Sequence, residues 1–393
     1  MNAERLWDAI IIGAGPAGSL AAFLLARLNY SVLLVDKARF PRHKVCGCCL
    51  NGVSLQLLTK FGLGKVIECL DPVSLHSFCL RTPGNSLEIN LLDSVALSRE
   101  ALDSSLISCA VNHGAVFIAE STAYVINAES TGRNVSITNE NGEALLKGRV
   151  VIVADGIAGR SLEKLPEFAP QIQAGSRIGA GTVLSSAPSY YRPGIIYMSS
   201  GKGGYVGMVR LEDARLDLAC AFDLEFVRSL GGPANAALKI LTEAGMIEPP
   251  ELRSAIWQGT GALTRSRRQK AAERLFVIGD AAAYAEPFTG EGISWALMSA
   301  SAVVPIASAA IKSWSARLVS VWTKEHSRLI GSRQSTSASL ARLLRSAKLT
   351  TLSLEALKRM PYIANALLLY LNSPAKTLAT DSLNESTYLA EVH

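Results

Sequence analysis

The chain has 393 residues, of which 49% are apolar and 18% charged, with 31 Gly and 15 Pro. This composition excludes a disordered chain, a collagen and a small disulfide-stapled fold, and the length suffices for two or three packed units. The net charge is +6, but residues 312–376 hold eleven Lys/Arg against two acids, a local charge of +9 that leaves −3 elsewhere. We therefore expect one basic C-terminal face and no nucleic-acid partner.

The cysteines and the N-terminal residues indicate a compartment. The seven Cys are too few and too unevenly spaced for a disulfide framework, and the first residues lack the features of a signal peptide. A cytoplasmic location is therefore predicted. Residues 292–311 carry no charge and are long enough for a membrane span, but their Ala and Ser content and Pro305 favour a helix buried in the protein.

The first strong motif is a glycine-rich turn near the N-terminus. An apolar run at 8–13 leads into it, a helical pattern follows it, and a second apolar run at 31–35 ends in Asp36. The turn consists of Gly13, Ala14, Gly15, Pro16, Ala17 and Gly18. This order is typical of a Rossmann dinucleotide-binding unit, in which the glycines permit the turn and the approach of the pyrophosphate, and the acid accepts a ribose hydroxyl. The turn alone does not distinguish NAD from FAD.

Two later segments have the form of buried parallel strands that end in an acid. Residues 149–154 run into Asp155-Gly156, and residues 275–278 run into Gly279-Asp280. A turn then precedes the uncharged helix and contains Pro287, Gly290, Glu291, Gly292 and Ile293. Because ligands of such sheets bind at the carboxyl ends of the strands, we expect these segments to meet at one site.

These three motifs, in this order and spacing, resemble the flavoproteins of the p-hydroxybenzoate hydroxylase fold, which include geranylgeranyl reductases and tryptophan halogenases. The resemblance implies an α/β fold with a Rossmann-type FAD-binding domain, an inserted antiparallel β-sheet substrate domain and C-terminal helices. It also implies that Asp280 bonds the ribityl or ribose part of FAD. The turn at 290–293 would start a helix beneath the isoalloxazine ring, where its dipole stabilises negative charge.

The resemblance extends to two smaller segments. Arg99 lies where relatives place an arginine that reaches the FAD, on a short strand that leads into a helix. Residues 114–115 open a strand whose later part, near Ala123, would contact the adenine through the backbone. Each segment also has a plainer interpretation, a surface arginine and an ordinary strand.

The residues after Asp36 resemble the geranylgeranyl reductase branch, in which a Lys-x-Cys-Gly loop faces the flavin. Cys46 is the matching cysteine, either a small residue packed on the flavin or a catalytic thiol. Arg42 and Lys44 supply positive charge beside the expected pyrophosphate and would lower a nearby thiol pKa, and Lys37 is a further candidate cofactor-binding residue. Cys46 and Cys49 form a CxxC, but no second pair follows and the five His are scattered, so no metal is expected.

The motifs divide the chain into three expected parts. Segments 1–75, 95–168 and 259–330 form the FAD-binding domain, segments 76–94 and 169–258 form the substrate-binding sheet, and 331–393 form a C-terminal helical segment. The alternating runs at 205–209 and 217–222 are typical of antiparallel strands. The chain lacks the Tyr-x-Trp-x-Phe-Pro element of prenyl reductases and the Trp-rich motif of tryptophan halogenases.

The C-terminal segment is amphipathic and basic. Between 340 and 360, the apolar residues 340, 343, 344, 347, 354 and 357 share one stripe, and the apolar run 361–371 follows. Such a helix either caps the flavin domain or lies on the inner face of a membrane as a peripheral contact.

We therefore expect an FAD-dependent oxidoreductase that acts on a hydrophobic small molecule. The favoured activity is an NAD(P)H-dependent monooxygenase that hydroxylates an aromatic or polyketide-like substrate. The alternatives are a geranylgeranyl reductase-type C=C reductase acting on an isoprenoid lipid, and a non-catalytic flavin-binding redox protein. The chain has no second GxGxxG, so NADPH or NADH would bind transiently near the flavin. The oligomeric state is left open.

Overall fold

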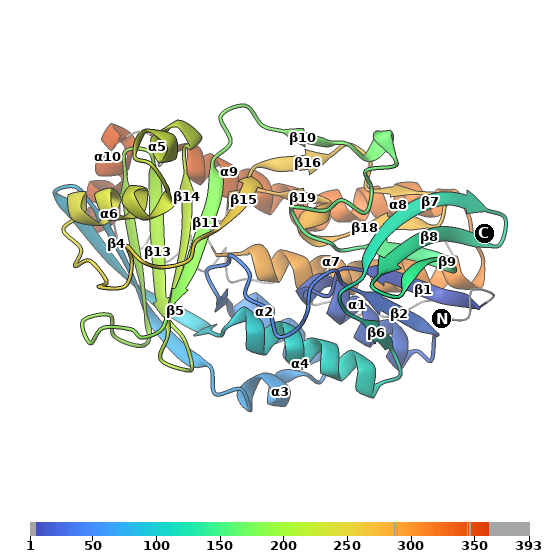
Figure 1. Ribbon diagram of the computed structural model, residues 1–393. Helices are drawn as coiled ribbons and strands as arrows, with labels where there is room; N and C mark the ends of the chain where they lie inside the picture. The colour runs from blue at the N-terminus through green and yellow to red at the C-terminus, as the bar shows by residue number, and fades with distance from the viewer. Residues whose placement is uncertain (1–4, 287, 289, 344, 346, 361–393) are drawn as a thin grey trace.

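The computed structural model describes residues 5–360, except 287, 289, 344 and 346. Two large sheets lie at opposite ends of the molecule, and helices cover them (Figure 1). This architecture confirms the predicted Rossmann-type α/β fold with a second, inserted sheet and C-terminal helices.

The first sheet is built on parallel strands that are buried on both faces. Its order is β17 (Ala271–Ala272), β18 (Leu275–Val277), β9 (Gly142–Val153), β1 (Leu6–Ile12), β2 (Val32–Val35) and β6 (Val116–Ile118), with β7 (Thr122–Glu129) and β8 (Gly132–Asn139) joined through β9. The pairs from β18 to β6 are parallel. The runs at 149–154 and 275–278 are thus parallel strands, as their apolar sequence predicts.

Helices cover one face of this sheet, and the β7–β8–β9 meander covers the other. The helices are α1 (Pro16–Arg27), α2 (Gly52–Lys60), α3 (Gly64–Glu68), α4 (Arg99–Asn112), α7 (Gly292–Lys312) and α8 (Arg317–His326). Among the described residues, only α7 is long and apolar enough to cross a membrane, and 89% of its most apolar stretch is buried inside the protein. The prediction of a buried helix at 292–311 is confirmed.

The second sheet contains eight strands and takes them from distant parts of the chain. Its order is β15 (Gln258–Ala262), β11 (Ile178–Leu184), β14 (Leu216–Phe222), β13 (Gly204–Arg210), β12 (Ile195–Gly201), β4 (Val73–Thr82), β5 (Asn85–Ala96) and β3 (Cys49–Leu50). Its pairs are antiparallel except β12 with β4, which are parallel because the chain passes through the first sheet between them. α5 (Leu224–Ser229) and α6 (Pro233–Glu243) lie beside this sheet (Figure 1), and α6 packs on one of its faces.

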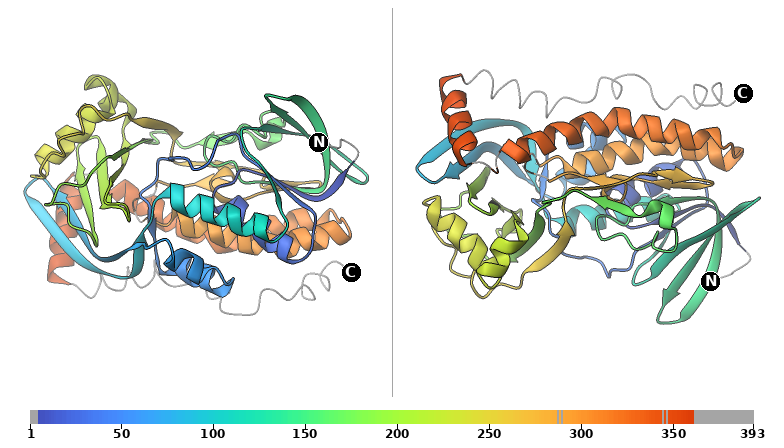
Figure 2. Two further views of the ribbon diagram at one scale, coloured as in Figure 1. Left: turned by 60° about the horizontal axis from the view of Figure 1, so that its bottom comes forward. Right: turned by 90° about the horizontal axis from the view of Figure 1, so that it is seen from above.

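Smaller elements join the two sheets. A short sheet contains β10 (Pro170–Ile172), β16 (Arg265–Arg267) and β19 (Ala283–Tyr284), and 3₁₀ turns occur at Pro166–Phe168 and Gly279–Ala281. A π-helical turn at Ser327–Gly331 continues α8 into α9 (Ser332–Leu343), and α10 (Ala347–Arg359) follows. Figure 2 shows α8 and α9 as one long rod, with α10 turned away from its end.

Two local expectations need correction. Ala123 does not lie on the strand that residues 114–115 open, because β6 ends at Ile118 and Ala123 belongs to β7. The stripe between 340 and 360 is divided between α9 and α10, which end and begin on either side of residues 344–346. Leu343, Leu354 and Leu357 line the central cavity, as a cap would. Residues 361–371 lie outside the described residues, and membrane contact stays a prediction.

Trp322 on α8 anchors the C-terminal helices to the first sheet. Its ring is fully buried, and its Nε1 donates a hydrogen bond to the Val277 carbonyl at 3.2 Å. We expect Trp322→Ala to lower the free energy of unfolding by about 3–5 kcal/mol, because it leaves a cavity and an unpaired carbonyl. Ser320→Ala, at an exposed position of the same helix, is the control. Urea unfolding checks both, and equal midpoints for the two variants would contradict this role.

Candidate functional site

A cavity of about 820 Å³ lies between the two large sheets. Its size is near the upper end of the range of small-molecule sites, about 300–1,000 Å³. The predicted site residues that line it are Gly13, Gly15, Pro16, Ala17, Asp36, Lys37, Arg42, Lys44, Cys46, Arg99, Ala123, Asp155, Gly156, Asp280, Gly290, Gly292 and Ile293. Ala14, Gly18, Gly279 and Glu291 lie outside the lining, and Pro287 lies outside the described residues.

The glycine-rich turn joins β1 to α1 at the cavity wall. Gly13 has a φ of +104°, and a Cβ there would collide with the backbone of Ala154. Gly18 packs so closely against the Gly13 carbonyl that a Cβ at position 18 would collide with the carbonyl oxygen. No side chain caps the N-terminus of α1, so its first amides are available to an anion.

Asp36 closes the same turn from the end of β2. Its carboxylate oxygen Oδ2 accepts a hydrogen bond from the backbone N–H of Ala14 at 2.7 Å. Its other oxygen, Oδ1, accepts one from the backbone N–H of Ala38 at 2.8 Å. The acid thus holds the two loops together, and it also lines the cavity where a ribose hydroxyl would bind.

Two arginines bring positive charge to the mouth of the turn. Arg99, the first residue of α4, donates from Nε and Nη2 to the buried carboxylate of Asp103, at 3.0 and 2.8 Å. Arg42 Nη2 lies 3.3 Å from the same carboxylate. A Cβ added at Gly15 would lie 3.7 Å from Arg99 Nη2 and 3.8 Å from Arg42 Nη2. The uncapped helix end and both guanidinium groups therefore converge on one anion site.

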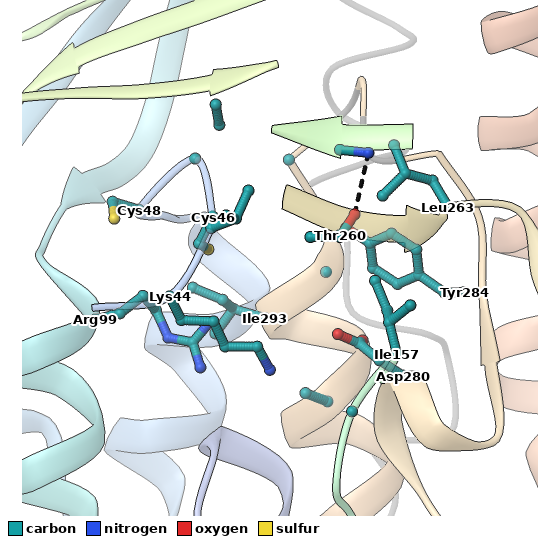
Figure 3. Close-up of a pocket in the computed structure, with 18 of the residues that line it drawn as sticks. Lys44, Cys46, Cys48, Arg99, Ile157, Thr260, Leu263, Asp280, Tyr284 and Ile293 are labelled. Carbon is teal, nitrogen blue, oxygen red and sulfur yellow. Dashed lines mark hydrogen bonds between the residues drawn. The ribbon is translucent and has the colours of Figure 1, made fainter. Parts of the chain in front are cut away.

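Lys44 and Asp280 face each other across the cavity, as Figure 3 shows. Burial raises the pKa of Asp280, and the nearby Lys44 opposes that rise. Burial also lowers the pKa of Lys44. Asp155 accepts the amide of Ser161 at 3.0 Å through Oδ2, but its buried Oδ1 has no partner among the described residues. These groups present hydrogen-bonding capacity to a polar ligand.

The N-terminus of α7 supplies a second uncapped helix end. Among the described residues, no side-chain capping hydrogen bond is found at this end, and Gly290, Gly292 and Ile293 line the cavity beside it. The predicted start of a helix at the 290–293 turn is therefore present. Glu291 turns away, because its fully buried carboxylate pairs with Arg333 of α9 at 3.2 Å.

The cysteine loop lies between the cofactor side and the second sheet. Cys46 is half-buried and Cys48 is buried, and both line the cavity near Arg99 (Figure 3). A hydrogen bond from the Cys48 thiol lowers the pKa of the Cys46 thiol well below its ordinary value, and Arg99 adds to this effect. The same hydrogen bond, with burial, raises the pKa of Cys48. The loop thus places a more acidic thiol, Cys46, beside a less acidic one, Cys48.

Sequence reasoning missed Cys48 and Asp217. Asp217 lies on β14, lines the cavity and is 1% exposed. An acid in the apolar run 216–222 was a visible signal, but only the folded sheet shows which face of the strand meets the cavity.

These features fit FAD. The anion site at Gly15 matches a pyrophosphate, the unpaired oxygen of Asp155 and the carboxylate of Asp280 match hydroxyl donors, and the α7 N-terminus matches a ring that becomes anionic when reduced. Among the described residues, no group of three His, Cys, Asp or Glu side chains could hold a metal ion.

Comparison with known proteins agrees with this site. Residues 7–328 match the FAD binding domain family. Menaquinone reductase of Mycolicibacterium smegmatis is 27% identical over 74% of this chain and 73% of its own length. Digeranylgeranylglycerophospholipid reductase 1 of Methanopyrus kandleri is 25% identical over 74% of this chain and 78% of its own. Conditioned medium factor receptor 1 of Dictyostelium discoideum is 27% identical over 75% of this chain, and the match spans 62% of that protein.

Solved structures show the same fold. A triple mutant of the flavin-dependent brominase Bmp2 aligns with a TM-score of 0.76 and 17% identity, over 98% of this chain and 99% of that one. PqsL of Pseudomonas aeruginosa, described as a probable FAD-dependent monooxygenase, aligns with a TM-score of 0.70 and 18% identity, over 88% and 98%. The chain therefore belongs to the FAD binding domain family and is an FAD-dependent oxidoreductase of the p-hydroxybenzoate hydroxylase-fold superfamily.

Proposed function

We propose that this protein is an FAD-dependent reductase that saturates a carbon–carbon double bond of an isoprenoid-type lipid. The observation that carries the proposal is the position of the cysteine loop, which places Cys46 and Cys48 between the cofactor side of the cavity and its apolar side. Two of the relatives, named menaquinone reductase and digeranylgeranylglycerophospholipid reductase, support a reductive reaction. We thus favour the second of the activities that the sequence suggested.

The apolar side of the cavity suits a hydrocarbon chain. Its walls come from the second sheet and from the C-terminal helices, and they are formed by Phe78, Leu80, Leu87, Ile89, Leu91, Ile196, Met198, Val209, Phe288, Leu343, Leu354 and Leu357. Burial of apolar substrate surface against these side chains would contribute about 25 cal/mol per Å². A long apolar substrate therefore gains binding energy along the whole wall.

The cofactor and the protein would supply different parts of the reaction. FAD, when bound and reduced, supplies the hydride. Arg42, Arg99 and the α1 N-terminus hold its pyrophosphate, and the α7 N-terminus favours negative charge at the ring. The cysteine loop holds the proton that the second carbon requires. We further propose a nicotinamide, NADPH or NADH, as the source of electrons.

Hydroxylation of an aromatic substrate is the second candidate. It is favoured by one feature, the lack of the Tyr-x-Trp-x-Phe-Pro element that prenyl reductases carry. Oxygen distinguishes the two reactions, since only a hydroxylase consumes it in proportion to substrate.

The first prediction concerns oxygen. We expect purified holoenzyme supplied with NADPH or NADH to oxidise the nicotinamide when a polyprenyl substrate is added, without matching uptake of oxygen. An oxygen electrode and the nicotinamide absorbance measure both rates in one sample. Substrate-dependent oxygen uptake equal to nicotinamide oxidation would instead establish the hydroxylase.

The second prediction concerns the anion site. Gly15 has room for a side chain in the protein itself, so Gly15→Val should fold normally while its methyl groups occupy the space of the pyrophosphate. We expect the purified variant to be colourless, with a melting temperature equal to that of the wild-type protein stripped of flavin. Gly62→Val is the control, since a Cβ at this distant position meets nothing within 4 Å, although its φ of +82° costs some stability. Retention of flavin by Gly15→Val would refute the placement.

The third prediction concerns Asp280. Asp280→Ala removes a charge-assisted hydrogen bond to the cofactor and should weaken FAD binding by about 1.5–3 kcal/mol. Titration of the apoprotein with FAD, followed by flavin fluorescence, gives the dissociation constant. Asp213 is an exposed acid outside the cavity lining, so the Asp213→Ala variant should bind FAD like the wild-type protein. An Asp280→Ala protein that remains fully loaded would show that the cofactor lies elsewhere.

A further inference from the structure

Asp217 is a buried acid at the face of the second sheet that meets the cysteine loop. Its neighbours across the sheet are Val183 on β11 and Val209 on β13. Both valines belong to the apolar cluster that includes Cys46, Cys48 and Cys49. Asp217 itself lines the cavity with Cys46 and Cys48. The register therefore places this carboxyl group on the face of the sheet that meets the cysteine loop.

The carboxyl group has an unusual environment. It is 1% exposed, and among the described residues neither oxygen has a geometrically well-formed hydrogen bond. A buried carboxylate in such a place would cost several kcal/mol, so the acid is expected to stay protonated. Among the second-sheet strand residues that line the cavity, Asp217 is the one with a carboxyl group.

Backbone structure fixes the cysteine loop against this acid. Cys48 has a φ of +51°, in the left-handed region that a non-glycine residue seldom adopts. Its carbonyl accepts the amide of Leu97 at 2.8 Å, and Cys49 pairs with Ala96 on β5. A Cβ at Gly181 of β11 would lie 3.0 Å from Val45, so the loop also packs closely on the sheet. Contacts with residues 96–97 on one side and with β11 on the other therefore hold the strained backbone of Cys48 in place.

Titratable groups from several elements surround Asp217. Burial raises its pKa well above the ordinary value, and Cys46 adds to that rise, as does Glu100 of α4. Cys48 and Arg215 oppose it. Asp217 in turn raises the pKa of Cys48, of Cys49 and of Cys220, the last on its own strand. Arg215 is itself paired with Asp213 at 2.6 Å and with Glu100 at 3.2 Å.

We propose that Asp217 is the proton reservoir of the reductive reaction and that its proton reaches the substrate through Cys48 and Cys46. This proposal rests on the proposed function. Asp217 is a positioning and proton-supplying residue, because the thiols lie between it and the cofactor side of the cavity.

In the proposed reaction the π bond of the alkene breaks. One carbon would gain the hydride, and with it the two electrons, that FAD would supply when bound and reduced, and FAD would thereby be oxidised. The other carbon gains a proton from Cys46. Cys46 then takes a proton from Cys48, and Cys48 takes one from Asp217. The ionised Asp217 regains its proton from water before the next turnover.

The test uses single turnovers of pre-reduced holoenzyme with a polyprenyl alcohol under anaerobic conditions. We expect the rate constant at saturating substrate to fall in the wild-type protein as pH rises through the pKa of the reservoir. Asp217→Asn should lower it by about 10²–10⁴-fold, the contribution of a positioned acid, and should flatten the pH profile. Asp217→Glu should restore part of the rate. FAD content and reduction by dithionite should be unchanged in both variants.

Glu225→Gln is the matched control, since this acid of α5 is exposed and pairs with the exposed Arg228 at 2.9 Å. It should keep both the wild-type rate and the wild-type pH profile. A wild-type protein that reduces no polyprenyl alcohol refutes the proposed function. A wild-type protein that does so, with an Asp217→Asn variant of equal rate and profile, refutes the reservoir alone. If Asp217→Asn binds the substrate more weakly but keeps the wild-type rate constant at saturating substrate, then Asp217 contributes to substrate binding and the reservoir proposal is refuted.

Stability provides a readout that does not depend on activity. A carboxyl group whose pKa is raised by folding stabilises the protein at low pH, and that contribution is lost as pH rises through the folded-state pKa. Asparagine does not ionise, so Asp217→Asn should gain stability relative to the wild type as pH increases from 6, by about 1.4 kcal/mol for each pH unit up to the folded-state pKa of Asp217, above which the difference stays constant. Urea unfolding at each pH measures the difference. A difference that is constant from pH 6 upward would show that Asp217 is already ionised and would overturn the proposal.

Discussion

The cofactor site depends on one buried carboxylate, that of Asp103. Arg99 and Arg42 both lie within ion-pair distance of it, at 2.8 and 3.3 Å, and the carboxylate has no exposure to solvent. Two guanidinium groups side by side at the end of α1 would repel each other. They can lie close together because the carboxylate between them offsets this repulsion. With Asp103 in place, the positive charge remains directed at the turn, where a second anion, the pyrophosphate, completes the balance.

The same cluster connects the cofactor to the second sheet. Arg99 and a hydrogen bond from Cys48 both lower the pKa of the Cys46 thiol, and Asp217 lines the same cavity as these thiols. A change of charge at the flavin ring would therefore alter the proton affinity of the thiols, and the thiols would alter that of the acid. The left-handed backbone at Cys48 carries a local conformational cost, which the surrounding contacts must offset.

The cofactor wall could be predicted from the sequence because each part of it is local. Gly13–Gly18, Asp36, Asp155 and Asp280 each follow directly on a parallel strand, and parallel strands bring their ends to one edge. Glu291 shows the limit of this reasoning, since it stands in the right turn but pairs with Arg333 from α9. The substrate side could not be predicted, because its sheet combines strands from residues 49–50, 73–96, 178–222 and 258–262. Only that assembly shows that Asp217, and not Leu216 or Leu218, faces the thiols.

In the proposed reaction, the apolar half of the cavity holds an alkene and the cysteine loop supplies its proton. The most direct measurement is the mass of the product that reduced holoenzyme forms from a polyprenyl alcohol in the absence of oxygen. We expect a product that has gained two hydrogen atoms per reduced flavin. Recovery of unchanged alcohol without oxygen, together with a product that has gained an oxygen atom in air, would contradict it.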